Sequence, residues 1–295
     1  MNTPTPEYLT TAELAALLRI KERKVYEMAA SGKVPCTRAT GKLLFPRLQI
    51  ESWLDEKASN PLRQAAVQER PNIFLGSHDP LLEWALKESG CRIASSFDGS
   101  MDGIDRFAGG EGVAAAMHLY EGDAEAWNTG SVSERFEGQP VVLVEFGWRQ
   151  RGLVIRPELK DRVRSVADLK GYRVTPRQSS AGSQILLLHL MRQQDVDSDA
   201  IDFGELAHTE TDAVTSILDG SADATLGLGS VARRFNLEFV PLMRERFDLL
   251  VDRRAWFEAP FQAFLSFCRS AAFRERAESL NDYDVSGFGN VHFNG

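Results

Sequence analysis

The chain has 295 residues, of which 43% are hydrophobic, and it carries a formal net charge of −8 at pH 7. This length leaves room for about two folded domains, and no apolar run approaches the ~20 residues that a membrane span requires. Three widely spaced cysteines suggest neither a disulfide framework nor a zinc site. The first residues lack the basic start and apolar core of a secretory signal, so we expect a cytoplasmic protein.

Residues 10–18 predict the first helix, because they combine an N-terminal cap with apolar positions at helical spacing. Thr10 supplies a hydroxyl before the helix, and Glu13 lies three positions later, which is the arrangement of a capping box. A short turn through residues 19–21 then leads to a second predicted helix over residues 22–30.

The second predicted helix divides its faces as the recognition helix of a DNA-binding module does. Its apolar side, formed by Val25, Met28 and Ala29, can face the first helix, and Ser31-Gly32 provides a C-terminal stop. The residues left to point outward are Arg23, Lys24 and Tyr26.

A short hairpin and a third helix are predicted next. Residues 34–38 and 42–45 are two extended runs around a turn signal at residues 39–41. Pro46 is then expected to open a helix over residues 47–54, since proline suits the first position of a helix.

The order of helix, turn, helix, hairpin and helix resembles the winged helix-turn-helix modules of excisionase and MerR-like proteins. The resemblance rests on YLTTAELAALLRIKERKVYEMAASGKVP and GKLLFPRLQIESWL, which cover about a sixth of the chain. It implies a domain over residues 1–57 that binds an operator in double-stranded DNA. Because one such module reads few bases, we expect a homodimer or a higher homo-oligomer on paired half-sites.

Charge supports a DNA-binding module. Residues 19–47 contain eight Lys or Arg and two acids, Glu22 and Glu27, whereas the whole chain is net negative. A basic module on an acidic chain favours contact with phosphate groups, although a solvated basic helix face gives the same composition. The residues that we predict to contact DNA are Arg19, Lys21, Arg23, Lys24, Tyr26, Arg38 and Lys42.

A second domain is predicted over residues 73–295, behind a linker at residues 58–72 that prolines bound. Strands there alternate with helices, which indicates a largely parallel sheet flanked by helices. The first predicted elements are strands at 73–76, 91–95 and 113–119 and helices at 81–88 and 101–107; a short capped helix at 165–171, a strand at 173–175 and a helix at 185–194 come later.

An internal echo indicates that this second domain has two lobes. Residues 102–113 and 212–223 both run from a helix through a glycine into a small-residue strand, 110 residues apart. Two unrelated units in one sheet would give the same pattern. Residues 141–155 are too long for one average strand, so they form either two strands broken at Gly147 or one strand that crosses between lobes.

A second resemblance rests on four segments of the second domain: WRQRGLVI (148–155), SVADLKGYRVTPRQSSAGSQILL (165–187), HTETDAVTSILDGSADATLGLGSVA (208–232) and LEFVPLMRERFDLLV (237–251). It is to the type II periplasmic-binding-protein fold, specifically the molybdate-receptor-related sensor domains fused to helix-turn-helix modules. It implies an α/β fold with two lobes and a ligand in the cleft between them. Such sensors often have Gly-Ser-Gly-Thr-Arg where this chain has Ser-Ala-Gly-Ser-Gln at 180–184, so the arginine of the usual ligand site is missing.

An anion is the ligand class that such a cleft favours, because backbone N–H groups and helix dipoles gather where strands end and helices begin. Serines stand at three of these places, although serine also caps helices that bind nothing. Two arginines offer paired donors for a carboxylate, sulfonate or phosphate, or for a salt bridge. The predicted ligand-binding residues are Ser77, Ser100, Arg149, Arg177, Ser179, Ser180 and Ser183.

These features predict a ligand-responsive transcriptional regulator that binds operator DNA and senses a small anionic molecule. The resemblance implies molybdate or tungstate, whereas the arginines favour an organic carboxylate or sulfonate. An enzyme that acts on a small anion with a DNA-targeting module is the alternative. However, the chain has no nucleophile elbow, Walker loop or His-Glu-x-x-His motif, so we expect no catalytic residues, cofactor or metal.

Overall fold

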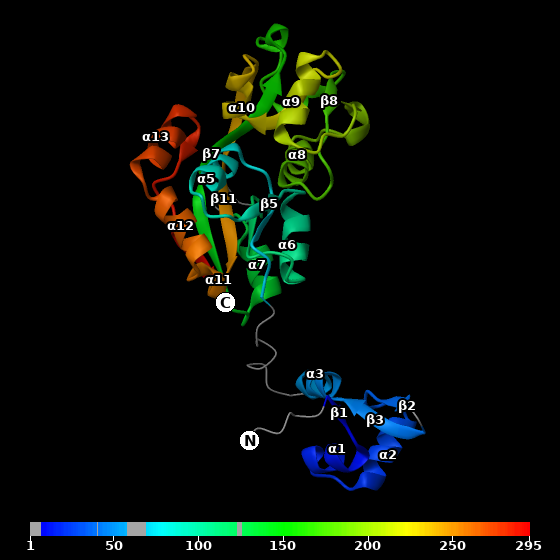
Figure 1. Cartoon of the computed structure of the whole chain (residues 1–295). Coiled ribbons are helices and arrows are strands. Elements are labelled where there is room, and N and C mark those ends of the chain that lie inside the picture. The colour runs from blue at the N-terminus through cyan, green and yellow to red at the C-terminus, as the bar shows by residue number, and fades with distance from the viewer. Residues whose placement is uncertain (1–6, 40, 58–68, 123–125) are drawn as a thin grey trace. The chain divides into compact units, whose positions relative to one another are not determined.

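The computed structural model describes residues 7–39, 41–57, 69–122 and 126–295. The chain divides into two units, residues 1–69 and 70–295, each with its own core (Figure 1). Most of the linker predicted at 58–72 lies outside the described residues, as does position 40 of the predicted hairpin turn. Over the ranges that are described, no helix is both long and apolar enough to cross a membrane.

The first unit combines three helices with a three-stranded sheet of order β1-β3-β2. Its elements are β1 (Tyr8–Leu9), α1 (Thr11–Leu18), α2 (Glu22–Ala30), β2 (Thr37–Ala39), β3 (Lys42–Pro46) and α3 (Arg47–Lys57). The predicted capping box is confirmed: the hydroxyl of Thr10 accepts from the backbone N–H of Glu13, whose carboxylate accepts from the N–H of Thr10 at 2.7 Å.

Two details of this unit differ from the prediction. β1 has only two residues, too few for a recognisable pattern, and pairs antiparallel with β3. Pro46 was expected to open the third helix, but it is the last residue of β3. Because proline has no N–H to continue a ladder, it suits the end of a strand as well as the start of a helix. Val25 of α2 is fully buried against the core, as the predicted face assignment requires.

The second unit is built around two long strands that pass through both of its lobes. β7 (Val141–Ile155) and β11 (Glu238–Asp252) each have 15 residues and pair antiparallel along nearly their whole length. Residues 141–155 are therefore one continuous strand. The sheet has the order β5-β4-β6-β11-β7-β10-β8-β9, and β12 and β13 also pair with β7.

The sheet is mixed, so the prediction of a largely parallel sheet holds only for its outer strands. We call lobe 1 the part that contains the parallel strands β4 (Ile73–Gly76), β5 (Ala94–Ser96) and β6 (Ala114–Met117). Lobe 2 contains the parallel strands β8 (Arg173–Thr175), β9 (Asp202–Phe203) and β10 (Ala224–Leu228). β7 and β11 carry the chain out of lobe 1 and back, so they run in opposite directions and pair antiparallel with their neighbours.

Helices cover both faces of the sheet in each lobe (Figure 1). Lobe 1 contains α5 (Pro80–Glu88), α6 (Ser100–Ala108), α7 (Thr129–Phe136), α11 (Arg253–Trp256), α12 (Ala259–Cys268), α13 (Ala271–Ser279), β12 (Tyr283–Asp284) and β13 (Val291–Asn294). Lobe 2 contains η1 (Pro157–Leu159), η2 (Val166–Leu169), α8 (Gly182–Gln193), η3 (Ser198–Ala200), α9 (Glu210–Leu218) and α10 (Gly229–Arg234). The two halves of the predicted echo are the units α6–β6 and α9–β10, one in each lobe.

Candidate functional site

In the first unit, the outward face of α2 is basic. The side chains of Arg23 and Lys24 are 90% and 61% exposed, and Tyr26 is also exposed. Glu27 lies 3.4 Å from a side-chain nitrogen of each cation. Such exposed ion pairs are weak, so both cations remain free to exchange Glu27 for a phosphate.

The other residues predicted to contact DNA also lie on the surface of this unit. Arg19 and Lys21 occupy the turn between α1 and α2, and Arg38 and Lys42 lie on the two strands of the hairpin. All four of these side chains are exposed, as a contact with DNA requires. Contact with DNA itself stays a prediction.

In the second unit, loops from the two lobes contact each other directly. The hydroxyl of Ser180, in lobe 2, donates to the carbonyl of Asp98, in lobe 1, at 3.2 Å. Gly99 has a φ of +116°, and a Cβ there would lie 2.9 Å from the carbonyl oxygen of Ser180. A Cβ on Gly182 would lie 2.7 Å from the carbonyl oxygen of His118. Glycine is thus required at both points where the lobes approach.

Three of the predicted serines are buried where the lobes meet. The hydroxyls of Ser77 and Ser100 are 2.7 Å apart, and that of Ser100 also accepts from the backbone N–H of His118 at 3.3 Å. α8 begins at Gly182, three residues earlier than predicted, so Ser183 lies in its first turn, next to the close contact between Gly182 and His118. Among the described residues its buried hydroxyl has no hydrogen-bond partner.

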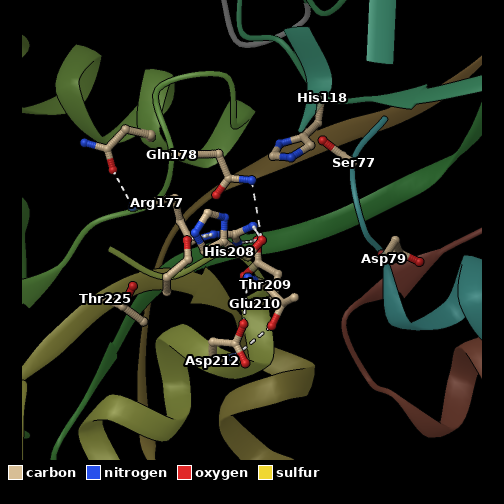
Figure 2. A network of polar contacts seen from close by, with 12 residues as sticks. Ser77, Asp79, His118, Arg177, Gln178, His208, Thr209, Glu210, Asp212 and Thr225 are labelled. Atoms are coloured by element: carbon tan, nitrogen blue, oxygen red, sulfur yellow. Dashed lines mark hydrogen bonds and ion pairs between the residues drawn. The ribbon is translucent and has the colours of Figure 1, made fainter. Parts of the chain in front are cut away.

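Residues of both lobes face this region. Figure 2 shows Ser77 and His118 of lobe 1 across from Gln178 and His208 of lobe 2. The side-chain amide of Gln178 donates to the carbonyls of Asp98 and His208, at 3.1 and 3.4 Å, and so links the lobes. Ser179, by contrast, is exposed on the neighbouring loop position.

Arg149 of β7 is buried between the lobes, and carboxylates already pair with it. Its Nη1 donates to Asp79 at 2.6 Å, and its Nε donates to Glu245 at 2.5 Å. The guanidinium also lies over the ring of Phe247, 4.1 Å from the ring centre. Only Nη2 is buried without a hydrogen-bond partner among the described residues, so one edge of the guanidinium is left for a ligand.

Arg151 extends this cluster into lobe 2. It lies two residues after Arg149 on the same face of β7, and it donates to Glu245 at 2.7 Å and to Glu210 at 2.8 Å. The sequence analysis missed Arg151 and all three carboxylates, including Asp79. The spacing of the two arginines was an available signal, since two cations on one buried strand face need buried acids as partners.

The arginines keep Glu245 and Glu210 ionised. Burial raises the pKa of Glu245, but Arg149 and Arg151 outweigh burial and hold that pKa well below its usual range. Burial acts on Glu210 in the same way, and Arg151 and Arg177 lower its pKa to about 2. The ring of His118 lies 3.1 Å from Glu245, yet burial lowers the pKa of His118, so the imidazole is neutral near neutral pH.

Arg177 holds the loop that precedes α9. Its Nε donates to the carbonyl of Ala207 at 3.0 Å and its Nη2 to that of His208 at 2.8 Å. Its Nη1 lies 3.3 Å from Glu210. Each of these contacts is to lobe 2 itself, so Arg177 positions the loop beside the site. Its contact with a ligand stays a prediction.

Comparisons with known proteins divide the chain in the same way. The family profile described as a PBP superfamily domain matches residues 83–269, and the profile described as a helix-turn-helix domain matches residues 8–58. The uncharacterised protein YvgK of Bacillus subtilis (strain 168) is 22% identical over 96% of each chain. An uncharacterised Clostridium pasteurianum protein, named for the 5′ region of a ferredoxin 2Fe-2S gene, is 25% identical over 36% of this chain and 96% of its own.

Solved structures include a Clostridium perfringens protein described as a phosphate ABC transporter substrate-binding protein with bound phosphate. It matches 72% of this chain and 99% of its own with a TM-score of 0.51 and 11% identity. An identity this low concerns the fold alone. The predicted fold, a helix-turn-helix followed by a two-lobed type II binding-protein domain, is thereby confirmed.

Proposed function

The chain belongs to the PBP superfamily, and from this premise we propose that it is a ligand-responsive transcriptional regulator. The main support for this proposal is that one chain contains both a helix-turn-helix and a two-lobed binding domain. The second helix of the helix-turn-helix exposes basic side chains. The first unit binds operator DNA in the cytoplasm, and two copies occupy paired half-sites. The second unit binds a small molecule and performs no catalysis.

The ligand of this proposal is a small oxyanion, such as phosphate, molybdate or tungstate. The donors between the lobes are short hydroxyls, those of Ser77, Ser100 and Ser183, together with the Nη2 edge of Arg149. Nε and one N–H of Nη1 of Arg149 already donate to Glu245 and Asp79. The serine hydroxyls therefore supply separate single donors, which suit the separate oxygens of a compact oxyanion. The related fold with bound phosphate supports the same ligand class.

Ligand binding between the lobes would control the DNA-binding unit through lobe closure. The contacts of Gln178 and Ser180 with Asp98 exist only when the lobes approach. A ligand that contacts both lobes favours this closed arrangement by its difference in affinity for the two arrangements. Ligand and operator then alter each other's affinity by the same factor.

A thermal-shift screen of phosphate, molybdate, tungstate, sulfate and small organic carboxylates and sulfonates tests the ligand class. We expect an oxyanion to raise the melting temperature of the full chain. The double variant Ser100→Ala/Ser183→Ala removes one donor from each lobe, and it should weaken binding of that oxyanion about tenfold or more, because a hydrogen bond to a charged group contributes about 1.5–3 kcal/mol.

The matched control is Ser133→Ala/Ser198→Ala, which removes one exposed hydroxyl from each lobe and should leave the affinity unchanged. Arg149 is a poor test residue, because its removal leaves Asp79 buried without its cation and takes one of two arginines from Glu245, at a cost of about 3–5 kcal/mol. The oxyanion site would be rejected if only organic anions raised the melting temperature, or if both double variants bound the oxyanion with equal affinity.

A further inference from the structure

A cavity of about 600 Å³ lies between the lobes, and none of the three buried serines Ser77, Ser100 and Ser183 lines it. Residues of α5 and α13 line it from lobe 1, and residues of α10 and the first turn of α9 line it from lobe 2. Figure 1 shows α10 and α13 on one side of the long strands and α6 and α8 on the other. One residue of the cavity wall, His78, directly follows Ser77 of this serine cluster in the chain.

Arginines dominate the charge of this cavity in a chain whose net charge is −8. Arg233, Arg234 and Arg276 line it together with one acid, Glu83. That acid is already paired with Lys87 at 2.8 Å and also lies near a histidine of the wall. No carboxylate of the cavity wall is therefore left over to neutralise the arginines.

Two of the arginines keep their charge available. Arg233 lies 2.5 Å from Asp282 and is thereby paired. Arg234 and Arg276 have no acidic partner within ion-pair distance among the described residues, and both are exposed to solvent. Their guanidinium groups lie 5.6 and 5.7 Å from the ring centres of Phe235 and Trp84, which is within the range of a cation–π contact.

These two free cations belong to different lobes. Arg234 ends α10, which packs through Val231 into an apolar cluster of lobe 2. Arg276 lies on α13, which packs through Phe273 into an apolar cluster of lobe 1. Like charges on the two walls of the cavity repel each other. An anion that contacts both walls removes this repulsion and links the lobes.

We propose that the cavity is a second ligand site, which binds a small molecule with two or more anionic groups. Its volume lies within the range of about 300–1,000 Å³ that is typical of organic-ligand sites, and a single oxyanion would leave most of it filled with water. Anionic groups at the two ends of the ligand can contact Arg234 and Arg276 at once. The site depends on the two-lobed domain of the proposed function, and not on the serine cluster or on DNA binding.

Isothermal titration of the full chain with inorganic tripolyphosphate and with citrate tests this site, and orthophosphate serves as the short-anion comparison. We expect at least one of the two larger anions to bind. The variant Arg234→Gln/Arg276→Gln should weaken that binding at least tenfold. The matched control is Arg192→Gln/Arg274→Gln, which removes the same charge from exposed helix positions of the same two lobes outside the cavity.

The control should bind within about twofold of the wild type, because neither of its side chains lines the cavity. Equal weakening in both double variants shows general attraction of anions and overturns the proposal, as does the absence of binding by both larger anions. Ser100→Ala/Ser183→Ala should bind the larger anion normally. Failure of the oxyanion site and failure of this second site therefore give different results.

Discussion

At the residue scale, backbone register fixes the buried charges between the lobes. Arg149 lies directly opposite Glu245 in the pairing of β7 with β11, so the ion pair forms whenever the two strands pair. Arg151 follows on the same strand face and reaches Glu210 in lobe 2. Buried ion pairs add little net stability, but the removal of one partner is strongly destabilising. We therefore interpret the cluster as a geometric support that holds the hinge strands and the start of α9 in position.

Glu210 should make the stability of the protein sensitive to acid. Its pKa of about 2 in the folded protein lies below its ordinary value of 4.5. The unfolded chain therefore takes up a proton first as the pH falls, and the free energy of unfolding should decrease between these two values by on the order of 3 kcal/mol. Glu210→Gln should be less stable at about pH 7 and should lose less stability on acidification.

Chemical denaturation of the full chain at a series of pH values checks this dependence. Glu275→Gln, at an exposed position of α13, is the control and should follow the wild-type curve. A wild-type slope that persists unchanged in Glu210→Gln would assign the acid sensitivity to other carboxylates.

At the element scale, sequence patterns predicted structure where the cause is local. The capping box of Thr10, the buried position of Val25 and the bounds of β8 depend on neighbours a few residues away. The carboxylates of the site were missed because Arg149 contacts Asp79 and Glu245, which are 70 and 96 residues away in the chain. Such partners follow from strand order and register, and these were not predicted.

The capping box also gives a prediction for the first unit. Thr10→Ala removes the hydroxyl that accepts from the N–H of Glu13, and it should destabilise the unit by about 1 kcal/mol. Hydrogen exchange of the α1 amides measures this loss. Thr37→Ala, at an exposed position of the hairpin, should change exchange little, and equal effects of the two variants would show that the cap contributes no specific stability.

At the scale of the whole molecule, the two units differ in how their charged groups are exposed. The basic groups of the first unit lie on an exposed helix, turn and hairpin, whereas Arg149 and Arg151 of the second unit are buried and paired with carboxylates. DNA affinity should therefore depend strongly on salt, because it arises from the release of counterions. The buried ion pairs should respond much less, since salt screens them weakly.

Binding to a DNA duplex of arbitrary sequence tests the first unit, because phosphate contacts do not require an operator. Arg23→Ala and Lys24→Ala should each lower the slope of log affinity against log salt by about 1 in fluorescence anisotropy. Arg192→Ala removes an exposed cation of the second unit and should keep the wild-type slope. Wild-type slopes in both α2 variants would contradict the assignment of α2 as the DNA-contacting helix.

The pairing of β7 with β11 has a mechanical consequence. Most hinges are loops that rotate freely, but here each lobe motion must bend a hydrogen-bonded ribbon that is continuous across the boundary. The register of this ribbon is irregular between Pro241 and Met243 and between Phe247 and Asp248, and such irregularities are where paired strands bend most easily. The ribbon should therefore bend elastically and mainly at these two positions. The lobes should then return to one preferred angle after each displacement.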